Sequence, residues 1–197
     1  MITLSKGNKK VKNTLIFNIA PITTCIGDCK GKEGKCYAMK ASRRFPNVRN
    51  CYNRNTEVAK SEGFKELMIA SIQYHVMNFS FKYFRIHEAG DFFNQRYLND
   101  WCDIASKFPN IKFLAYTKSF QLNFDNVPSN LTIINSIWGN ENQYTKFANK
   151  GFKTSVVVND LNDIKFNSNK DFVCPADDCS TCRKCWGTDK NIIFKLH

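Results

Sequence analysis

The chain reads Asn13-Thr-Leu-Ile-Phe-Asn-Ile-Ala-Pro21 and soon afterwards Cys25-Ile-Gly-Asp-Cys29-Lys-Gly-Lys-Glu-Gly-Lys-Cys36-Tyr37. The first stretch predicts a short buried strand, because β-branched and aromatic residues are bounded there by polar residues and a proline. Glycines between the three cysteines permit the positive-φ turns that bring sulfur atoms to one point. We therefore expect a strand that ends in a metal-binding loop. The alternative is a flexible basic surface loop, although free cysteine is usually buried and not placed among lysines and glycines.

Downstream of this loop, apolar runs alternate with helical patterns. The sequence predicts strands at 82–87, 111–116, 131–138, 153–159 and 191–196, and helices at 56–78, 97–108 and 141–149. In the first helix, Thr56 is the expected N-cap. This alternation predicts an α/β fold with a parallel sheet, either a partial (β/α) barrel or a doubly wound sheet. Functional residues would then lie at the carboxyl ends of the strands.

The length of 197 residues and the hydrophobic content of 43% suit one packed domain with a small appended module. We expect residues 1–160 to form the β/α domain and residues 161–197 to form a cysteine-rich tail packed on it. Residues 160–170 are rich in Asn and Asp and are expected to be a linker. The apolar runs are too short for a membrane helix, and the N-terminus lacks the apolar region of a signal peptide. These features predict a cytoplasmic protein with no membrane partner.

The nine cysteines favour metal binding over disulfides if the protein is cytoplasmic. The tail carries Cys174-x4-Cys179-x2-Cys182-x2-Cys185, which matches the ligand count of an iron-sulfur cluster or of tetrahedral zinc. Consecutive x2 spacings resemble ferredoxin-type runs, so we expect an iron-sulfur cluster here, with zinc as the alternative.

The N-terminal group of Cys25, Cys29 and Cys36 has only three thiols. A 4Fe-4S cluster held by three cysteines keeps one iron open to substrate or cofactor, unless another residue such as Cys51 closes that position. An open position suggests chemistry, and S-adenosylmethionine is a cofactor that such an iron could bind.

These three cysteines, followed by Tyr37, and the segment Ala89-Gly90-Asp91 after the second strand resemble motifs of the radical S-adenosylmethionine superfamily. The resemblance implies a partial (β/α) barrel, a 4Fe-4S cluster on the three thiols, and cofactor contacts from Tyr37, Gly90 and Asp91. The x6 interval before Cys36 is longer than the usual x2 and requires a different loop path. The other interpretation of Asp91 is the N-cap of the helix that begins near Asn94.

Longer segments resemble the phage family called gene product 88. They are Arg85-Ile-His-Glu-Ala-Gly-Asp-Phe92, Tyr116-Thr-Lys118 and Cys174 to Trp186. The resemblance implies a phage protein that works in the cytoplasm of a bacterial host. Our leading interpretation is an iron-sulfur protein with one or two 4Fe-4S clusters, resembling radical S-adenosylmethionine enzymes and acting on an unidentified substrate.

The net charge of +12 supports a different class of function. Residues 40–54 interleave arginines with aromatics, as segments that contact phosphates or bases do, or they are a solvated connection. The alternative function is thus a nucleic-acid- or host-protein-binding factor with structural iron-sulfur or zinc sites. A third is a redox sensor or inhibitor of a host protein. His87, Glu88 and Lys118 fall at strand ends, where each has either a chemical or a structural role.

Overall fold

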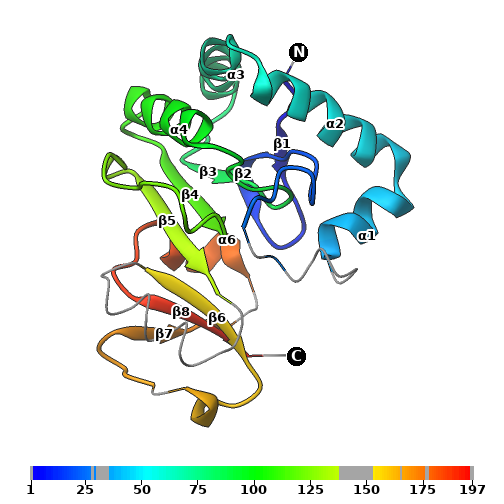
Figure 1. The fold of residues 1–197 in the computed structure, drawn as a ribbon. Helices are drawn as coiled ribbons and strands as arrows, with labels where there is room; N and C mark the ends of the chain where they lie inside the picture. The colour runs from blue at the N-terminus through cyan, green and yellow to red at the C-terminus, as the bar shows by residue number, and fades with distance from the viewer. Residues whose placement is uncertain are drawn as a thin grey trace.

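A computed structural model describes residues 2–27, 29, 36–137, 153–164, 166–175 and 178–195. Over these ranges, the strands form one sheet, and the longest helices lie in the chain between its second and fourth strands (Figure 1). The elements in chain order are β1 (Ser5–Gly7), β2 (Lys12–Phe17), α1 (Tyr37–Arg44), α2 (Pro46–Lys60), α3 (Phe64–Asn78), β3 (Tyr83–Ile86), α4 (Gln95–Lys107), β4 (Lys112–Thr117), β5 (Leu131–Ser136), β6 (Thr154–Val158), η2 (Leu161–Asp163), β7 (Asp171–Val173), α6 (Cys179–Cys182), η3 (Lys184–Trp186) and β8 (Asn191–Lys195).

The strands of the described ranges form an open sheet in the order β1-β2-β3-β4-β5-β6-β8-β7. Only β1 is antiparallel to its neighbour, and every other pair is parallel. The predicted α/β class with a mainly parallel sheet is therefore confirmed. From β2 to β6 each strand lies beside the next one in the sequence, so their carboxyl ends meet at one edge of the sheet.

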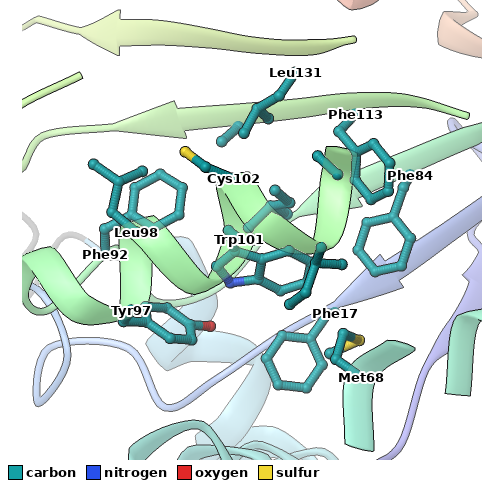
Figure 2. Close-up of a cluster of buried hydrophobic side chains, with 14 of the residues drawn as sticks. Phe17, Met68, Phe84, Phe92, Tyr97, Leu98, Trp101, Cys102, Phe113 and Leu131 are labelled. Carbon is teal, nitrogen blue, oxygen red and sulfur yellow. The ribbon is translucent and has the colours of Figure 1, made fainter. Parts of the chain in front are cut away.

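One face of the sheet packs on helices through an aromatic core. Phe17, Phe84 and Phe113, from three adjacent strands, are fully buried on this face together with Trp101 of α4. The ring centroids of Phe17 and Phe84 lie 5.8 and 5.4 Å from that of Trp101 (Figure 2). Asn94 caps α4 by accepting a hydrogen bond from the Tyr97 amide at 2.9 Å, and this sets where the helix begins.

The opposite face is covered by the C-terminal tail. Because side chains alternate along a strand, Leu114 points away from the helices and packs with Ile134 and Trp186. The indole Nε1 of Trp186 donates a hydrogen bond to the Phe84 carbonyl at 3.1 Å, and its ring meets Tyr83 edge-on. The tail is thus fastened to the middle of the sheet and also supplies β7 and β8 at its edge.

Two predictions about the helices were wrong. Thr56 is no N-cap: it lies buried inside α2, where its hydroxyl donates to Tyr52 O at 2.7 Å and accepts from Ala20 N at 2.8 Å. The predicted helix 56–78 is two helices, α2 and α3, and residues 40–54 belong to α1 and α2 instead of a connection. The predicted helix at 141–149 lies outside the described residues.

Within the predicted linker, Asp160 and Asp163 form a capping box around η2. Across the part of the chain that the structure describes, no helix is long and apolar enough to cross a membrane.

Candidate metal and ligand site

The loops that follow β2 and β3 are pressed together at Gly90. This residue has φ +88°, and a Cβ atom on it would lie 2.3 Å from Ile19 Cγ1 and 3.0 Å from Thr24 Oγ1. Only glycine fits such a conformation and such a contact. The segment directly before Cys25 is therefore held in place by the loop after β3.

A second close approach joins the cysteine loop to β4. A Cβ atom at Gly27 would lie 1.9 Å from the carbonyl oxygen of Lys118, directly after β4. The backbone of the loop after β2 therefore lies in direct contact with the backbone at the end of β4. Together the two glycine contacts bring the carboxyl ends of β2, β3 and β4 to one place.

Asp91 strengthens this junction from inside. The residue is 6% exposed. Its carboxylate accepts hydrogen bonds from the Thr117 hydroxyl at 2.6 Å, from Lys118 N at 2.8 Å and from Phe92 N at 2.8 Å. Burial raises its pKa, although the three hydrogen bonds act in the opposite direction. The cap of α4 is Asn94, so the interpretation of Asp91 as an N-cap was wrong.

The N-terminal thiols share one neighbourhood at this junction. The pKa of Cys25 is raised to about 11, mainly by burial and in smaller part by the charges of Asp91, Cys29 and Cys36. All three cysteines are free thiols. The structure therefore brings the three predicted ligands within electrostatic reach of one another.

A lysine lies beside these thiols. The Lys118 ammonium donates hydrogen bonds to the carbonyl and hydroxyl of Ser136 on β5, at 2.5 and 2.9 Å. Burial lowers its pKa, whereas Cys29, Asp91 and Cys25 raise it. The cation therefore stands next to groups that become negative when the thiols ionise.

Tyr37 connects the end of the cysteine loop to the loop after β3. It is the first residue of α1, and its hydroxyl donates a hydrogen bond to the Glu88 carbonyl. Although the residue is 68% exposed, its hydroxyl end is enclosed, and burial raises the hydroxyl pKa while Arg85 lowers it. Tyr37 thus stands at the rim of the site.

The four tail cysteines border one small cavity of about 20 Å³. Backbone hydrogen bonds anchor them: Cys174 N donates to Ile193 O at 2.8 Å, and Cys179 N donates to Lys10 O at 3.2 Å. Burial raises the pKa of Cys179 and of Cys185, and the Tyr116 hydroxyl lies within hydrogen-bonding reach of Cys185. The tail thiols are free, as are the other cysteines of the chain.

A larger cavity of about 670 Å³ lies beside the tail cysteines. Three tail cysteines border it, and so do Tyr37, Arg85 and Tyr116. The Arg85 guanidinium lies 4.2 Å from the centre of the Tyr116 ring, and its Nε donates to the His87 carbonyl at 3.1 Å. The Arg85 charge lowers the pKa of Cys179, of Cys185 and of Tyr37.

Sequence reasoning missed Arg85 as a site residue. It lies between the buried residues Phe84 and Ile86 on β3, so its side chain leaves the sheet on the face away from the helices. That alternation was the available signal. The alternation could not indicate which residues share the cavity with Arg85. The tail supplies several of them, among them Cys174 and Cys185, from far along the chain.

His87 is structural. It is 3% exposed, its Nε2 shares a hydrogen bond with the Tyr97 hydroxyl at 2.9 Å, and its ring stacks on Tyr97. Burial lowers its pKa to about 3, so the ring is neutral at pH 7. Cys51 on α2 borders a separate cavity beside the N-terminal residues.

To bind a metal ion, thiols must lie around one point at ligand distances, which is a stricter requirement than lying near one another. No group of three or more His, Cys, Asp or Glu side chains, among those the structure describes, is arranged to hold a metal ion. The chemistry of the donors fits an iron-sulfur cluster or zinc, because each group consists of free thiols gathered along one short segment. Binding would require each segment to tighten, which is usual where metal binding is coupled to folding.

Comparison with known proteins gives one match. The family model described as "Gene product 88" matches residues 2–188, which is nearly the whole chain. No curated protein matches the chain, and no solved structure matches it. None of these comparisons links it to radical S-adenosylmethionine enzymes, so that part of the resemblance stays a hypothesis. The extent of the family match shows that this chain belongs to the gene product 88 family of phage proteins.

Proposed function

We propose that the protein is an iron-sulfur enzyme of the radical S-adenosylmethionine type. The observation that supports this most is the neighbourhood of Cys25, Cys29 and Cys36 at the junction of the β2, β3 and β4 strand ends. Tyr37, which follows Cys36, borders the 670 Å³ cavity. The sequential order of β2 to β6 is also the order that a partial (β/α) barrel requires. In such folds ligands bind at the carboxyl ends of the strands.

The residues of the junction have complementary roles in this proposal. Cys25, Cys29 and Cys36 hold a 4Fe-4S cluster, which when bound supplies the electron for reductive cleavage of S-adenosylmethionine. Gly90 lets the loop after β3 pack directly against the segment before Cys25, and this places Asp91 beside the cysteine loop. The Asp91 carboxylate keeps one lone pair, on Oδ2, beyond its three internal hydrogen bonds, and this accepts from the cofactor's ammonium group.

Tyr37 and Lys118 complete the proposed site. Tyr37 borders the cavity where the cysteine loop enters α1 and gives the cofactor a ring to pack on. Lys118 offsets the negative charge that accumulates when the thiols ionise.

The tail cysteines bind a second centre in the same proposal. Cys174, Cys179, Cys182 and Cys185 form a complete set of four ligands, which suits a closed structural centre better than an open catalytic one. A 4Fe-4S cluster is the first choice for this centre, and zinc is the alternative. Its role is to hold the tail against the sheet.

The test uses the full chain purified without oxygen. Iron, sulfide and zinc are measured together with the absorbance spectrum, in which a broad band near about 400 nm is expected. Replacing Cys25, Cys29 and Cys36 together with Ala should remove about half of the iron if both centres are 4Fe-4S clusters. Stoichiometric zinc without sulfide in the native protein would refute the proposal that the protein is an iron-sulfur enzyme.

Catalysis is tested on the reduced, clustered protein. Incubation with S-adenosylmethionine should produce methionine and 5′-deoxyadenosine and should perturb the EPR signal of the cluster. A fully clustered sample that neither binds nor cleaves the compound would remove radical chemistry from the proposal while leaving the metal centres in place.

A second function, nucleic-acid binding, is favoured by the charge of α1 and α2. Residues 36–56 contain no Asp or Glu. Exposed cations follow one another along the two helices, at Lys40, Arg43, Arg44, Arg49 and Arg54. Exposed phosphate-binding surfaces have this composition.

Binding to a labelled single strand and to a duplex, at several salt concentrations, tests this function. Replacing Arg43, Arg44 and Arg49 with Gln should weaken binding and flatten its salt dependence. Replacing the exposed Lys107 of α4 should leave both unchanged. Tight binding whose affinity does not change with salt concentration would contradict nucleic-acid binding through the cations of α1 and α2.

A further inference from the structure

We propose that the 670 Å³ cavity binds a small organic anion with an aromatic or other apolar body, and that Arg85 holds its anionic group. The acid is a carboxylate, sulfonate or phosphate monoester. Cys174, Cys179 and Cys185, the tail ligands of the function proposed above, also border this cavity, but Arg85 has no part in that function. Anion binding by Arg85 can therefore be tested separately.

The first support is the incomplete hydrogen bonding of Arg85. Its Nε donates to the His87 carbonyl at 3.1 Å, and within the described ranges neither terminal nitrogen has a hydrogen-bond partner. Ion pairs in those ranges are Lys65 with Asp103 and Arg96 with Asp100, so Arg85 has no carboxylate of its own. A guanidinium offers five donors, and the terminal pair matches the two oxygens of a carboxylate or phosphate.

The second support is that the guanidinium is already fixed in position. The face of Tyr116 lies 4.2 Å from it, and the bond to the His87 carbonyl sets its rotation. A cation held in this way loses little side-chain entropy when it binds an anion.

The acid among the described residues of the cavity wall, Glu88, forms no ion pair with Arg85. Its Oε1 accepts a hydrogen bond from the Asn8 side chain at 2.7 Å. Lys10 also borders the cavity and adds a second positive charge. The electrostatic balance of the described lining therefore favours an anion.

The third support is the rest of the wall, which is mainly apolar. Leu114, Val156, Trp186 and Phe194 border the cavity from three strands and from η3. Sites for small molecules commonly have volumes of about 300 to 1,000 Å³ with mainly apolar walls and a few polar groups that fix orientation. This cavity has that composition, with Arg85 as the orienting group.

The experiment uses two fluorescent probes of similar shape on the full chain, purified without oxygen. One is the anion 8-anilinonaphthalene-1-sulfonate, and the other is the neutral N-phenyl-1-naphthylamine. Replacing Arg85 with Gln should weaken binding of the sulfonate at least about tenfold and leave the neutral probe unchanged. Arg85→Lys, which keeps the charge but loses the fork, should give an intermediate loss.

Lys107→Gln is the matched control, because it removes one exposed cation on α4, outside every proposed binding surface, and should change neither affinity. Equal affinity of the sulfonate for the wild type and for Arg85→Gln would overturn the proposal. A parallel loss of both probes would also overturn it.

A measurement on the unmodified protein covers the case in which the Arg85 variants fail to fold. Benzoate should displace the sulfonate probe, whereas benzyl alcohol at the same concentration should not. Displacement by both compounds to the same extent, or by neither, would refute a site selective for anions.

Discussion

The backbone of Gly27 approaches Lys118 so closely that a Cβ atom on the glycine would lie 1.9 Å from the lysine carbonyl oxygen. The position of Cys25 and Cys29 therefore depends on the absence of a side chain between them. Because the same lysine is hydrogen-bonded to Asp91 and to Ser136, it joins the cysteine loop to the ends of β3, β4 and β5.

Replacing Gly27 with Ala should displace the cysteine loop. We expect the free energy of unfolding to fall by about 1 to 3 kcal/mol, since a methyl group cannot overlap a backbone carbonyl. Bound iron should fall as well. The matched control is Gly63→Ala, where a Cβ atom meets nothing within 4 Å. If both variants keep wild-type stability and iron, the close approach has no role in holding the loop.

Trp186 should be the main anchor of the tail. It is buried and bonded to the Phe84 carbonyl. Trp186→Ala should lower the free energy of unfolding by about 3 to 5 kcal/mol, and Trp186→Phe, which loses mainly the hydrogen bond, by about 1 to 2 kcal/mol. Urea denaturation followed by circular dichroism measures both. Tyr74→Ala, at an exposed position on α3, is expected to cost about 0.5 kcal/mol or less. Equal effects of Trp186→Ala and Tyr74→Ala would contradict the anchoring role.

His87 should make the protein less stable as the pH falls below neutrality. The unfolded chain takes up a proton near pH 6.5, whereas the buried ring does so only near pH 3. Between these values the unfolded state binds more protons, so its stabilisation should reduce the free energy of unfolding by about 2 kcal/mol between pH 7 and pH 5.

The check is the pH dependence of urea denaturation in matched variants. His87→Asn should lose this part of the decline, because asparagine does not titrate and tolerates the positive φ of 61° at this position. His75→Asn on α3 should keep the wild-type slope. Identical slopes in the wild type and both variants would show that His87 is not the titrating group.

Cys182→Ser should lower the metal content and the melting temperature together. A tail segment with few apolar residues cannot form a core of its own, so loss of one ligand should loosen it. Cys102→Ala is the comparison, because Cys102 lies in the helical core and outside both groups of thiols. It should cost packing energy without any loss of metal. Unchanged metal content in Cys182→Ser would exclude this residue as a ligand.

The central sheet could be predicted because its strands are continuous apolar runs. Residues 15–17 and 113–116 have that character, and the structure has strands there. β7 escaped detection because it has three residues and begins with a buried aspartate, whose partner is the Asn191 side chain at 2.9 Å. This hydrogen bond between polar side chains helps to hold β7 on β8, and a search for apolar periodicity does not detect it.

The helices α1 and α2 were missed for a similar reason. Their buried positions include Ser42, Asn55 and Thr56, which an apolar pattern leaves out. The Asn55 amide donates to Thr3 O and to Asn18 O, both at 2.9 Å, and so replaces apolar packing with hydrogen bonds to distant segments. Such partners are known only once the chain is folded.

At the site, spacing and strand ends were sufficient to indicate the cysteines, Gly90 and Asp91 as neighbours. The contacts that define the cavity were not predictable in this way. Arg85 becomes a site residue only because Tyr116 and the tail meet it on the same face of the sheet. Those contacts join segments separated by tens of residues, so no local pattern records them.

The placement of β8 between β6 and β7 imposes an order on the assembly of the protein. Strands β2 to β6 can each pair with a strand that the ribosome has already released. β7 cannot, because its neighbour in the sheet is synthesised after it, and β6 must keep its outer edge unpaired until the same strand arrives. During translation the sheet therefore stays incomplete beyond β6 until β8 has been synthesised. The same strand also fixes the start of the tail cysteine segment, because the Ile193 carbonyl accepts a hydrogen bond from the Cys174 amide.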